Sequence, residues 1–342
     1  MDSVKILSGM GVKGPACIRL DVGGMRLILD CGTGPDEGAD FDPAWLAGAD
    51  AVLITHDHVD HIGGARHAVA AGLPIHATRQ TAALLPAGAD LRLLPERGVT
   101  RIAGVDLTTG RNGHAAGGVW MHFDMGEGLF YSGDWSEESD WFAFDPPPPA
   151  GTAILDCSYG GFDVAQSDCI ADLDDLLEVL PGQVLLPVPP SGRAAELALR
   201  LIRRHGPGSV MVDDACLPAI AHLPEARGLA SATEARFLVC DTPNAEAGAA
   251  WRHLRAWRDA GRLGQDAHVV FTGHMNAHAR GFCDRPGGHF RRWNVHPPLR
   301  DQRRMLERLA ARRFAPAFCP DPEIYLALDM GAQVFMHQEV TP

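Results

Sequence analysis

The chain has 342 residues, of which 46% are hydrophobic and 21% are charged. This composition is typical of a globular protein of about two domains, and it excludes a collagen, a coiled coil and wholesale disorder. The net charge of −13 argues against general nucleic-acid binding by an evenly charged surface. The charge is uneven, however, because residues 252–313 hold fourteen Arg against five acids and carry a net charge of +9.

The eight cysteines include no C-x-x-C pair, so the sequence predicts neither a zinc ribbon nor a disulfide scaffold. No apolar run approaches the roughly 18 residues of a membrane span. Residues 1–10 lack the charged and apolar regions of a signal peptide. We therefore expect a cytoplasmic protein with reduced thiols.

Short strands dominate the first half of the chain. Residues 16–31 alternate between apolar and polar positions around Gly23-Gly24, which predicts a hairpin that ends at Asp30. The other elements expected before residue 160 are strands at 51–54, 120–123, 129–131 and 153–155 and a helix at 64–72.

After residue 160, strands alternate with longer helices, a pattern typical of layered α/β proteins. Ser191 and Thr242 are predicted helix N-caps, with Pro243 at the first helical position and Gly261 beyond the end. The expected elements are helices at 166–180, 191–205, 243–260, 299–313 and 323–330 and strands at 184–188 and 268–272.

A cluster of metal-binding side chains directly follows the strand at 51–54. It has the spacing H-x-H-x-D-H and comprises His56, His58, Asp60 and His61. Imidazole nitrogen and carboxylate oxygen are natural ligands of zinc and similar divalent ions. Because side chains alternate along extended backbone, His56 and His58 are predicted to point the same way, and the next two residues can turn toward a second ion.

Further motifs follow in order, and together they carry a family resemblance. They are Leu29-Asp30-Cys31-Gly32, the His56–His61 loop, Gly113-His114-Ala115-Ala116-Gly117-Gly118, Tyr131-Ser132-Gly133-Asp134, Asp156-Cys157-Ser158-Tyr159-Gly160, Gly192-Arg193-Ala194-Ala195-Glu196-Leu197 and Trp293-Asn294-Val295-His296. This order resembles the metallo-β-lactamase superfamily and, within it, the β-CASP nucleases. That branch includes the endonuclease subunit of the mRNA 3′-end processing machinery and the bacterial J-type ribonucleases.

The resemblance implies an α/β fold, namely a metallo-β-lactamase αββα sandwich with an inserted, shortened β-CASP α/β domain. Residues 1–160 would form the first part of the metallo-β-lactamase lobe. Residues 161–294 would form the β-CASP-like insertion, and residues 295–342 would complete the first lobe.

The resemblance also implies two divalent metal ions, with zinc favoured. One ion would be held by His56, His58 and His114, the other by Asp60 and His61, with Asp134 as a bridge and Asp30 orienting a ligand histidine from outside. Cys319 stands where the family's last motif has a histidine, so it would complete the second site. Two alternatives remain open, that Cys319 has no role, or that His337 on an expected final strand binds instead.

For catalysis, the resemblance implies that the two metals share a hydroxide that attacks phosphorus, with Asp60 among the catalytic residues. His296 would donate a proton to the leaving oxygen, and Asp156 would hold the His296 side chain in place. The carboxylate that the family carries two residues later is replaced here by Pro298.

Basic and aromatic residues near His296 are expected to bind substrate phosphates, with Phe290 or Trp293 stacking on a base. Ordinary charge pairs are the expectation for Arg303, Arg308 and Arg312. The candidate substrate-binding residues are Arg193, Arg280, Arg285, Arg291, Arg292 and Trp293.

The function predicted from this resemblance is a metal-dependent phosphodiesterase that hydrolyses RNA or single-stranded DNA. Nucleic acid is the expected partner, with a homo-oligomer or a partner subunit as further possibilities. Two alternatives are kept because a fold does not fix the substrate. One is a hydrolase of a small ester, lactone, thioester or cyclic phosphodiester, and the other is a non-catalytic subunit of a nuclease complex.

Overall fold

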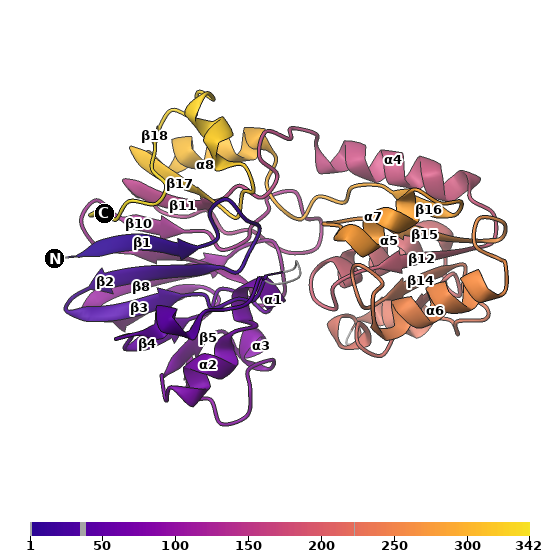
Figure 1. Cartoon of the computed structure of the whole chain (residues 1–342), viewed down its shortest axis with the longest axis horizontal. Helices are drawn as coiled ribbons and strands as arrows, with labels where there is room; N and C mark the ends of the chain where they lie inside the picture. The colour runs from indigo at the N-terminus through magenta and orange to yellow at the C-terminus, as the bar shows by residue number, and fades with distance from the viewer. Residues whose placement is uncertain (1, 35–38, 222) are drawn as a thin grey trace. The chain divides into compact units, whose positions relative to one another are not determined.

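The computed structural model describes residues 2–34, 39–221 and 223–342. The chain divides into two compact units, Met1–Asp163 with Val295–Pro342, and Val164–Asn294 (Figure 1). The second unit therefore interrupts the first along the chain, at 163/164 and 294/295, where the sequence suggested boundaries at 160/161 and 294/295.

The first unit contains a six-stranded sheet, antiparallel from β1 to β3 and parallel from β3 to β6. Side chains alternate across it, so Leu27 and Leu29 enter one apolar cluster while Ile28 enters another on the opposite face. Both faces are therefore covered. The strands are β1 (Ser3–Ser8), β2 (Cys17–Val22), β3 (Met25–Leu29), β4 (Ala51–Leu53), β5 (Ile75–Ala77) and β6 (Leu91–Leu93).

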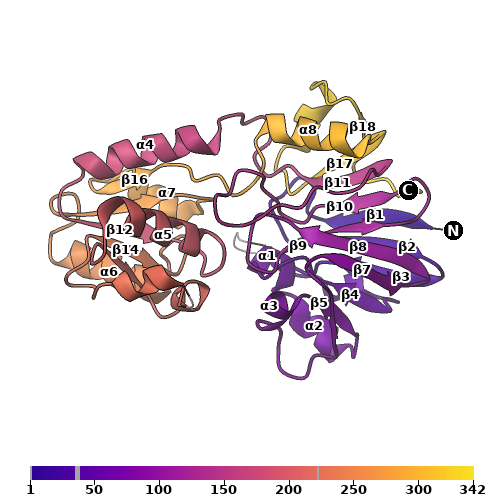
Figure 2. The ribbon, with the colours of Figure 1, turned by 180° about the vertical axis from the view of Figure 1, so that it is seen from behind.

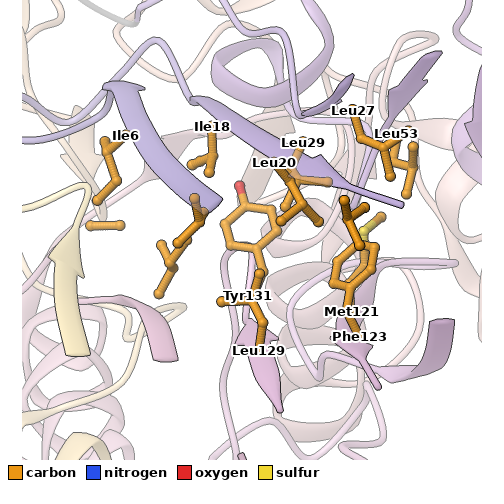
Figure 3. Packing of buried hydrophobic residues seen from close by; sticks show 14 of the residues in the cluster. Ile6, Ile18, Leu20, Leu27, Leu29, Leu53, Met121, Phe123, Leu129 and Tyr131 are labelled. Carbon is orange, nitrogen blue, oxygen red and sulfur yellow. The ribbon is translucent and has the colours of Figure 1, made fainter. Parts of the chain in front are cut away.

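A seven-stranded sheet forms the other half of this unit, in the order β18-β17-β11-β10-β9-β8-β7. Its inner face packs on the first sheet through residues such as Phe123, Leu129 and Tyr131, which meet Leu20 and Leu27 (Figure 3). The strands are β7 (Gly98–Ile102), β8 (Val105–Arg111), β9 (Val119–Phe123), β10 (Leu129–Tyr131), β11 (Thr152–Asp156), β17 (Arg313–Ala317) and β18 (Gln333–Val334).

Helices cover the two outer faces of this sandwich. Helices α1 (Val59–Ile62), α2 (Ala65–Ala70) and α3 (Arg79–Ala82) lie on the side of the first sheet, and α8 (Leu299–Leu309) lies on the side of the second (Figure 2). Leu306 and Leu309 of α8 belong to an apolar cluster with strand residues of the second sheet. The unit is thus an αββα sandwich, which confirms the expected fold class.

The second unit is built on a parallel five-stranded sheet in the order β13-β14-β12-β15-β16. Its strands are almost continuously apolar, as expected of parallel strands covered on both faces. The elements are α4 (Gln166–Val179), β12 (Gln183–Pro187), α5 (Arg193–His205), β13 (Val210–Val212), β14 (Phe237–Cys240), α6 (Gly248–Asp259), β15 (Ala267–Phe271), α7 (Ala277–Cys283) and β16 (Gly288–Phe290).

Several helix ends differ from the sequence predictions. Helix α6 begins at Gly248 rather than at Pro243, because Thr242 Oγ1 accepts from the Ala247 amide and closes a turn before the helix. Helix α5 begins after Gly192 instead of being capped by Ser191.

The C-terminal elements also differ from expectation. Helix α8 ends at Leu309, and its C-cap Ala310 has a left-handed φ of 52°, so Arg313 joins strand β17 instead of the helix. The helix expected at 323–330 is a short 3-10 helix, Pro322–Leu326. None of the helices in the described part of the chain has both the length and the apolar character needed to cross a membrane.

In the second unit, Asp241 directly follows β14, and its amide donates to Asp213 Oδ2 at 3.3 Å. Burial, together with the negative charges of Asp213 and Glu246, raises the pKa of Asp241 to about 6. The folded chain therefore binds this proton more tightly than the unfolded chain does, and stability is lost as pH rises from about 4 to about 6.

We expect Asp241→Asn to raise the free energy of unfolding at pH 7 by about 1 kcal/mol, a figure reduced for the partial exposure of the carboxylate. Near pH 4 the gain should vanish, because the aspartate is then neutral in both states. Denaturant unfolding at the two pH values measures this, with Asp214→Asn at an exposed neighbouring carboxylate as the control. A gain of equal size at both pH values would contradict the electrostatic explanation.

Candidate metal centre

The predicted histidine loop connects β4 to α1 and lies entirely in the first unit. His56 and His61 are fully buried, although imidazoles are costly to bury without polar partners. The partners come from strands and loops distant in sequence, so the site is assembled from several sequence motifs.

Four side chains form the first donor group, which we define as His56, His58, His114 and Asp134. His58 Nδ1 lies 2.9 Å from His114 Nε2. Asp134 Oδ2 lies 3.6 Å from His114 Nε2 and 3.8 Å from His56 Nε2. Ligands about 2.0–2.2 Å from a tetrahedral zinc ion lie roughly 3.3–3.6 Å apart, and the separations of 2.9, 3.6 and 3.8 Å in this group fall on both sides of that range, so small side-chain shifts would let it hold one ion.

Hydrogen bonds fix which nitrogen atoms face the centre of this group. His114 Nδ1 donates to the Val295 carbonyl at 2.6 Å, and His56 Nδ1 donates to Thr55 Oγ1 at 3.0 Å. The opposite atom of His56, Nε2, is buried with no hydrogen-bond partner among the described residues. A histidine engaged at one nitrogen presents the other to a metal, so the Nε2 of His56 is placed to bind a divalent ion.

The same two imidazoles have the protonation state that a metal requires. Burial, reinforced by the neighbouring histidines, holds the pKa of His56 and of His114 well below the ordinary value. Both rings are therefore neutral at pH 7 and can each offer a lone pair.

The second donor group consists of Asp60, His61 and Asp134. His61 Nε2 lies 3.2 Å from Asp134 Oδ1, and His61 Nδ1 donates to Asp30 Oδ2 at 2.8 Å. Burial opposes ionisation of the His61 imidazole, but the Asp134 and Asp30 carboxylates outweigh it and hold the pKa of His61 well above the ordinary value.

Asp30 is the organising carboxylate behind this group. It is fully buried, with a left-handed φ of 59°, and its oxygens accept from the Thr55 amide at 2.7 Å, from Thr55 Oγ1 at 2.8 Å and from the Tyr131 hydroxyl at 2.5 Å. Asp30 contacts His61 but is not itself a member of either donor group. The resemblance implies the same arrangement, in which Asp30 orients a ligand histidine.

Lys13 lies between the carboxylates of the second donor group, a position that sequence reasoning missed. Its Nζ is 3.4 Å from Asp60 Oδ2 and 3.3 Å from Asp134 Oδ2. Although burial raises a carboxyl pKa, Lys13 and His61 outweigh it and hold the pKa of Asp134 well below its usual range. The only signal in the sequence is the rarity of lysine, which occurs at positions 5 and 13 alone.

The structure does not bring Cys319 or His337 into a donor group among the residues it describes. The Cys319 side chain belongs to an apolar cluster with Cys157 and Tyr325, and burial raises its pKa to about 11. Phe318 takes the place beside His61, with ring centroids 5.0 Å apart. His337 is exposed and lies beyond the last strand, β18, instead of on it.

A third group joins His296 and Asp156 to Asp134. His296 Nδ1 donates to Asp156 Oδ2 at 2.8 Å, and the same Nδ1 lies 3.6 Å from Asp134 Oδ2. The His296 and His114 ring centroids are 5.0 Å apart, so His296 adjoins the first donor group. The Ser158 amide donates to the other oxygen of Asp156 at 2.9 Å and holds that carboxylate.

The residues expected to bind substrate all lie in the second unit. Trp293 is 4% exposed and its Nε1 donates to Glu196 at 2.9 Å, so its indole offers no open face for stacking on a base. Arg193 is also buried, 3.4 Å from Thr272 Oγ1. The remaining four contact Asp172 (Arg291), the Met275 carbonyl (Arg280) and the rings of Phe282 (Arg285) and Phe290 (Arg292).

Two of the three arginines expected to form ordinary charge pairs do so, since Arg308 pairs with Glu137 and Arg312 with Glu127. Arg303 instead donates to the Asp329 carbonyl at 3.2 Å. These contacts account for part of the positive window without any ligand.

Comparison with known proteins gives matches to the first unit and to the whole fold. Residues 25–137 match the family described as the beta-lactamase superfamily domain. The chain is 30% identical to ribonuclease TTHA0252 of Thermus thermophilus over 225 residues, 54% of this chain and 51% of that protein. It is 27% identical to the transcription termination factor FttA of Methanocaldococcus jannaschii over 253 residues, 60% of this chain and 40% of that protein.

The chain therefore spans about half the length, or less, of these curated relatives. A solved structure of a protein of unknown function from Enterococcus faecalis V583 covers 100% of both chains with a TM-score of 0.66. At 13% sequence identity, that likeness shows the fold alone.

Proposed function

We propose that this chain is a metal-dependent nuclease of the β-CASP branch of the β-lactamase superfamily. The match of residues 25–137 to the beta-lactamase superfamily domain, and the likeness to a ribonuclease and to a transcription termination factor, support this proposal. The substrate would be RNA or single-stranded DNA. The observation that carries this proposal is the first donor group with the His296–Asp156 pair beside it. RNA is the favoured substrate because one curated relative is named a ribonuclease.

A divalent ion in the first donor group would supply the Lewis acidity that activates water and polarises a phosphoryl oxygen. Three imidazoles and one carboxylate favour zinc over magnesium or calcium, which prefer oxygen ligands. His56, His58, His114 and Asp134 would hold this ion.

The residue that handles the leaving group is His296. Its Nδ1–H donates to Asp156, so Nε2 is the atom available to hold a proton for the departing oxygen. Val295, the preceding residue, donates its amide to the Tyr159 hydroxyl at 3.1 Å and its carbonyl accepts from His114. The backbone at 295 therefore fixes the position of the acid relative to a metal ligand.

The second unit carries several arginines, and guanidinium groups bind the phosphates of a nucleic-acid backbone. A strand held by several guanidinium groups would bind with an affinity that falls steeply with salt. Because the window 252–313 carries +9 in a chain of −13, we expect nucleic acid to bind through this part of the chain.

The proposal is tested by cleavage of 5′-labelled RNA and single-stranded DNA of the same sequence. We expect cleavage that a chelator abolishes and added zinc restores. Turnover of a small chromogenic ester without oligonucleotide binding would instead indicate a small-molecule hydrolase. A metal-free chain that binds RNA without cutting it would indicate a non-catalytic subunit.

A further inference from the structure

The ammonium group of Lys13 lies where the second donor group converges. It is 3.4 Å from Asp60 Oδ2 and 3.3 Å from Asp134 Oδ2, and the side chain is 12% exposed. A buried lysine is costly unless its charge is paired, and here it is paired with two carboxylates. Those carboxylates are the oxygen ligands on which a second ion would depend.

The backbone holds Lys13 in this position from both sides. Lys13 belongs to the loop between β1 and β2, in which the Gly11 amide donates to the Cys319 carbonyl at 3.0 Å. After Lys13, the Ala16 amide donates to the Asp60 carbonyl at 2.8 Å. The loop is thus fastened to the residue that presents one of the two carboxylates.

Among the residues that the structure describes, the same contacts leave the second group without a fourth ligand. The Phe318 amide donates to the Gly9 carbonyl at 2.6 Å, and a Cβ at Gly9 would lie 2.9 Å from Phe318 Cε1. Phe318 therefore packs closely on this loop with its ring against His61, and it has no donor atom for a metal. Lys13 Nζ lies 5.8 Å from the centre of the same ring.

We propose that the ammonium of Lys13 takes the place of the second metal ion, so that the chain binds one divalent ion, in the first donor group. Asp60 and Asp134 share one positive charge that belongs to the chain. The orientation of His61 is held by Asp30, to which its Nδ1 donates at 2.8 Å. A doubly charged ion placed among Asp60, His61 and Asp134 would meet the ammonium as a like charge.

This inference rests on the proposed function and deepens it, because it identifies the Lys13 ammonium as the second positive charge of the site. The Lys13 ammonium donates to Asp134 Oδ2 at 3.3 Å and forms an ion pair with Asp60 at 3.4 Å. Lys13 would thereby supply part of the charge stabilisation that a second ion would otherwise give.

The test is the number of ions per chain, which needs no substrate. The chain is freed of metal, loaded with zinc, separated from excess zinc and measured by elemental analysis. We expect about one zinc ion in the wild type and about two in Lys13→Met, which opens the second group. Calorimetric titration of the metal-free proteins should likewise show one class of site in the wild type and a second class in the variant.

Two further variants complete the design. Lys13→Arg keeps the charge and should stay at about one ion. Lys5→Met removes the other lysine, which lies on β1, and is the matched control at about one ion. Two ions in the wild type would overturn the proposal even if Lys13→Met failed to fold. One ion in a folded Lys13→Met would also overturn it, since Lys13 would then not be what excludes the second ion.

The count also separates this proposal from the proposed function. If the chain binds one ion but cuts no nucleic acid, the proposal for Lys13 stands and the proposed nuclease function is wrong. If the chain binds two ions and cuts RNA, the nuclease function stands and the proposal for Lys13 is wrong.

Discussion

His58→Ala is expected to release the bound ion and to lower kcat/KM for oligonucleotide cleavage by at least about 10³-fold. The imidazole contributes one of four donor atoms and lies 2.9 Å from His114 Nε2, so its loss opens the first donor group. A 10³-fold loss corresponds to about 4 kcal/mol, the scale on which a catalytic ion acts. Elemental analysis and single-turnover cleavage measure the two effects on the same preparations.

The matched control is His67→Ala. His67 lies on α2 and stacks on Phe41, with ring centroids 5.7 Å apart, outside the donor groups found among the described residues. It should retain the ion and the activity. Full cleavage by folded, metal-free His58→Ala would show that the measured nuclease is a contaminant.

His296→Ala is expected to lower kcat by about 10²–10⁴-fold, the usual contribution of a general acid, while the metal content stays unchanged. The ring holds no atom of the first donor group, but it adjoins His114 and is oriented by Asp156. Asp156→Asn should give a smaller loss. The double variant should be no worse than His296→Ala, because both side chains serve one proton transfer.

A substrate whose leaving oxygen is replaced by sulfur makes this assignment specific. A thiolate departs without protonation, so His296→Ala should cleave the sulfur substrate at nearly the wild-type rate. An equal loss on both substrates would assign His296 a role in binding or positioning instead. The exposed His337→Ala is the control, and it should cleave both substrates normally.

Local sequence patterns were sufficient for the elements whose side chains follow a simple period. Alternation predicted the strand pair that supplies Leu20 and Leu27 to the core, and the structure has both strands there. The ends of helices were predicted less well. Helix α6 does not begin at Pro243, because Thr242 forms a turn with Ala247 there instead. Helix α8 ends before Ala310, which adopts a left-handed conformation although it is not a glycine.

The His56–His61 loop illustrates what spacing alone can predict about a site. Residues that close in sequence remain close in space once a strand has placed the first of them. Their positions as metal ligands stay a prediction until ions are counted, but their proximity follows from the chain itself. The pairing of Asp156 with His296 came only from the order of motifs, because 140 residues separate the two.

The sequence by itself determined the class of chemistry, since three imidazoles and a carboxylate gathered within six residues after a buried strand favour a divalent metal. Only the tertiary structure decided how the second donor group is filled. The left-handed φ of 62° at Phe318 directs its ring, rather than the Cys319 thiol, toward His61. Lys13 reaches Asp134 from 121 residues away. Neither outcome has a local signal, because both depend on how the β1–β2 loop is fastened to the end of β17 by long-range hydrogen bonds.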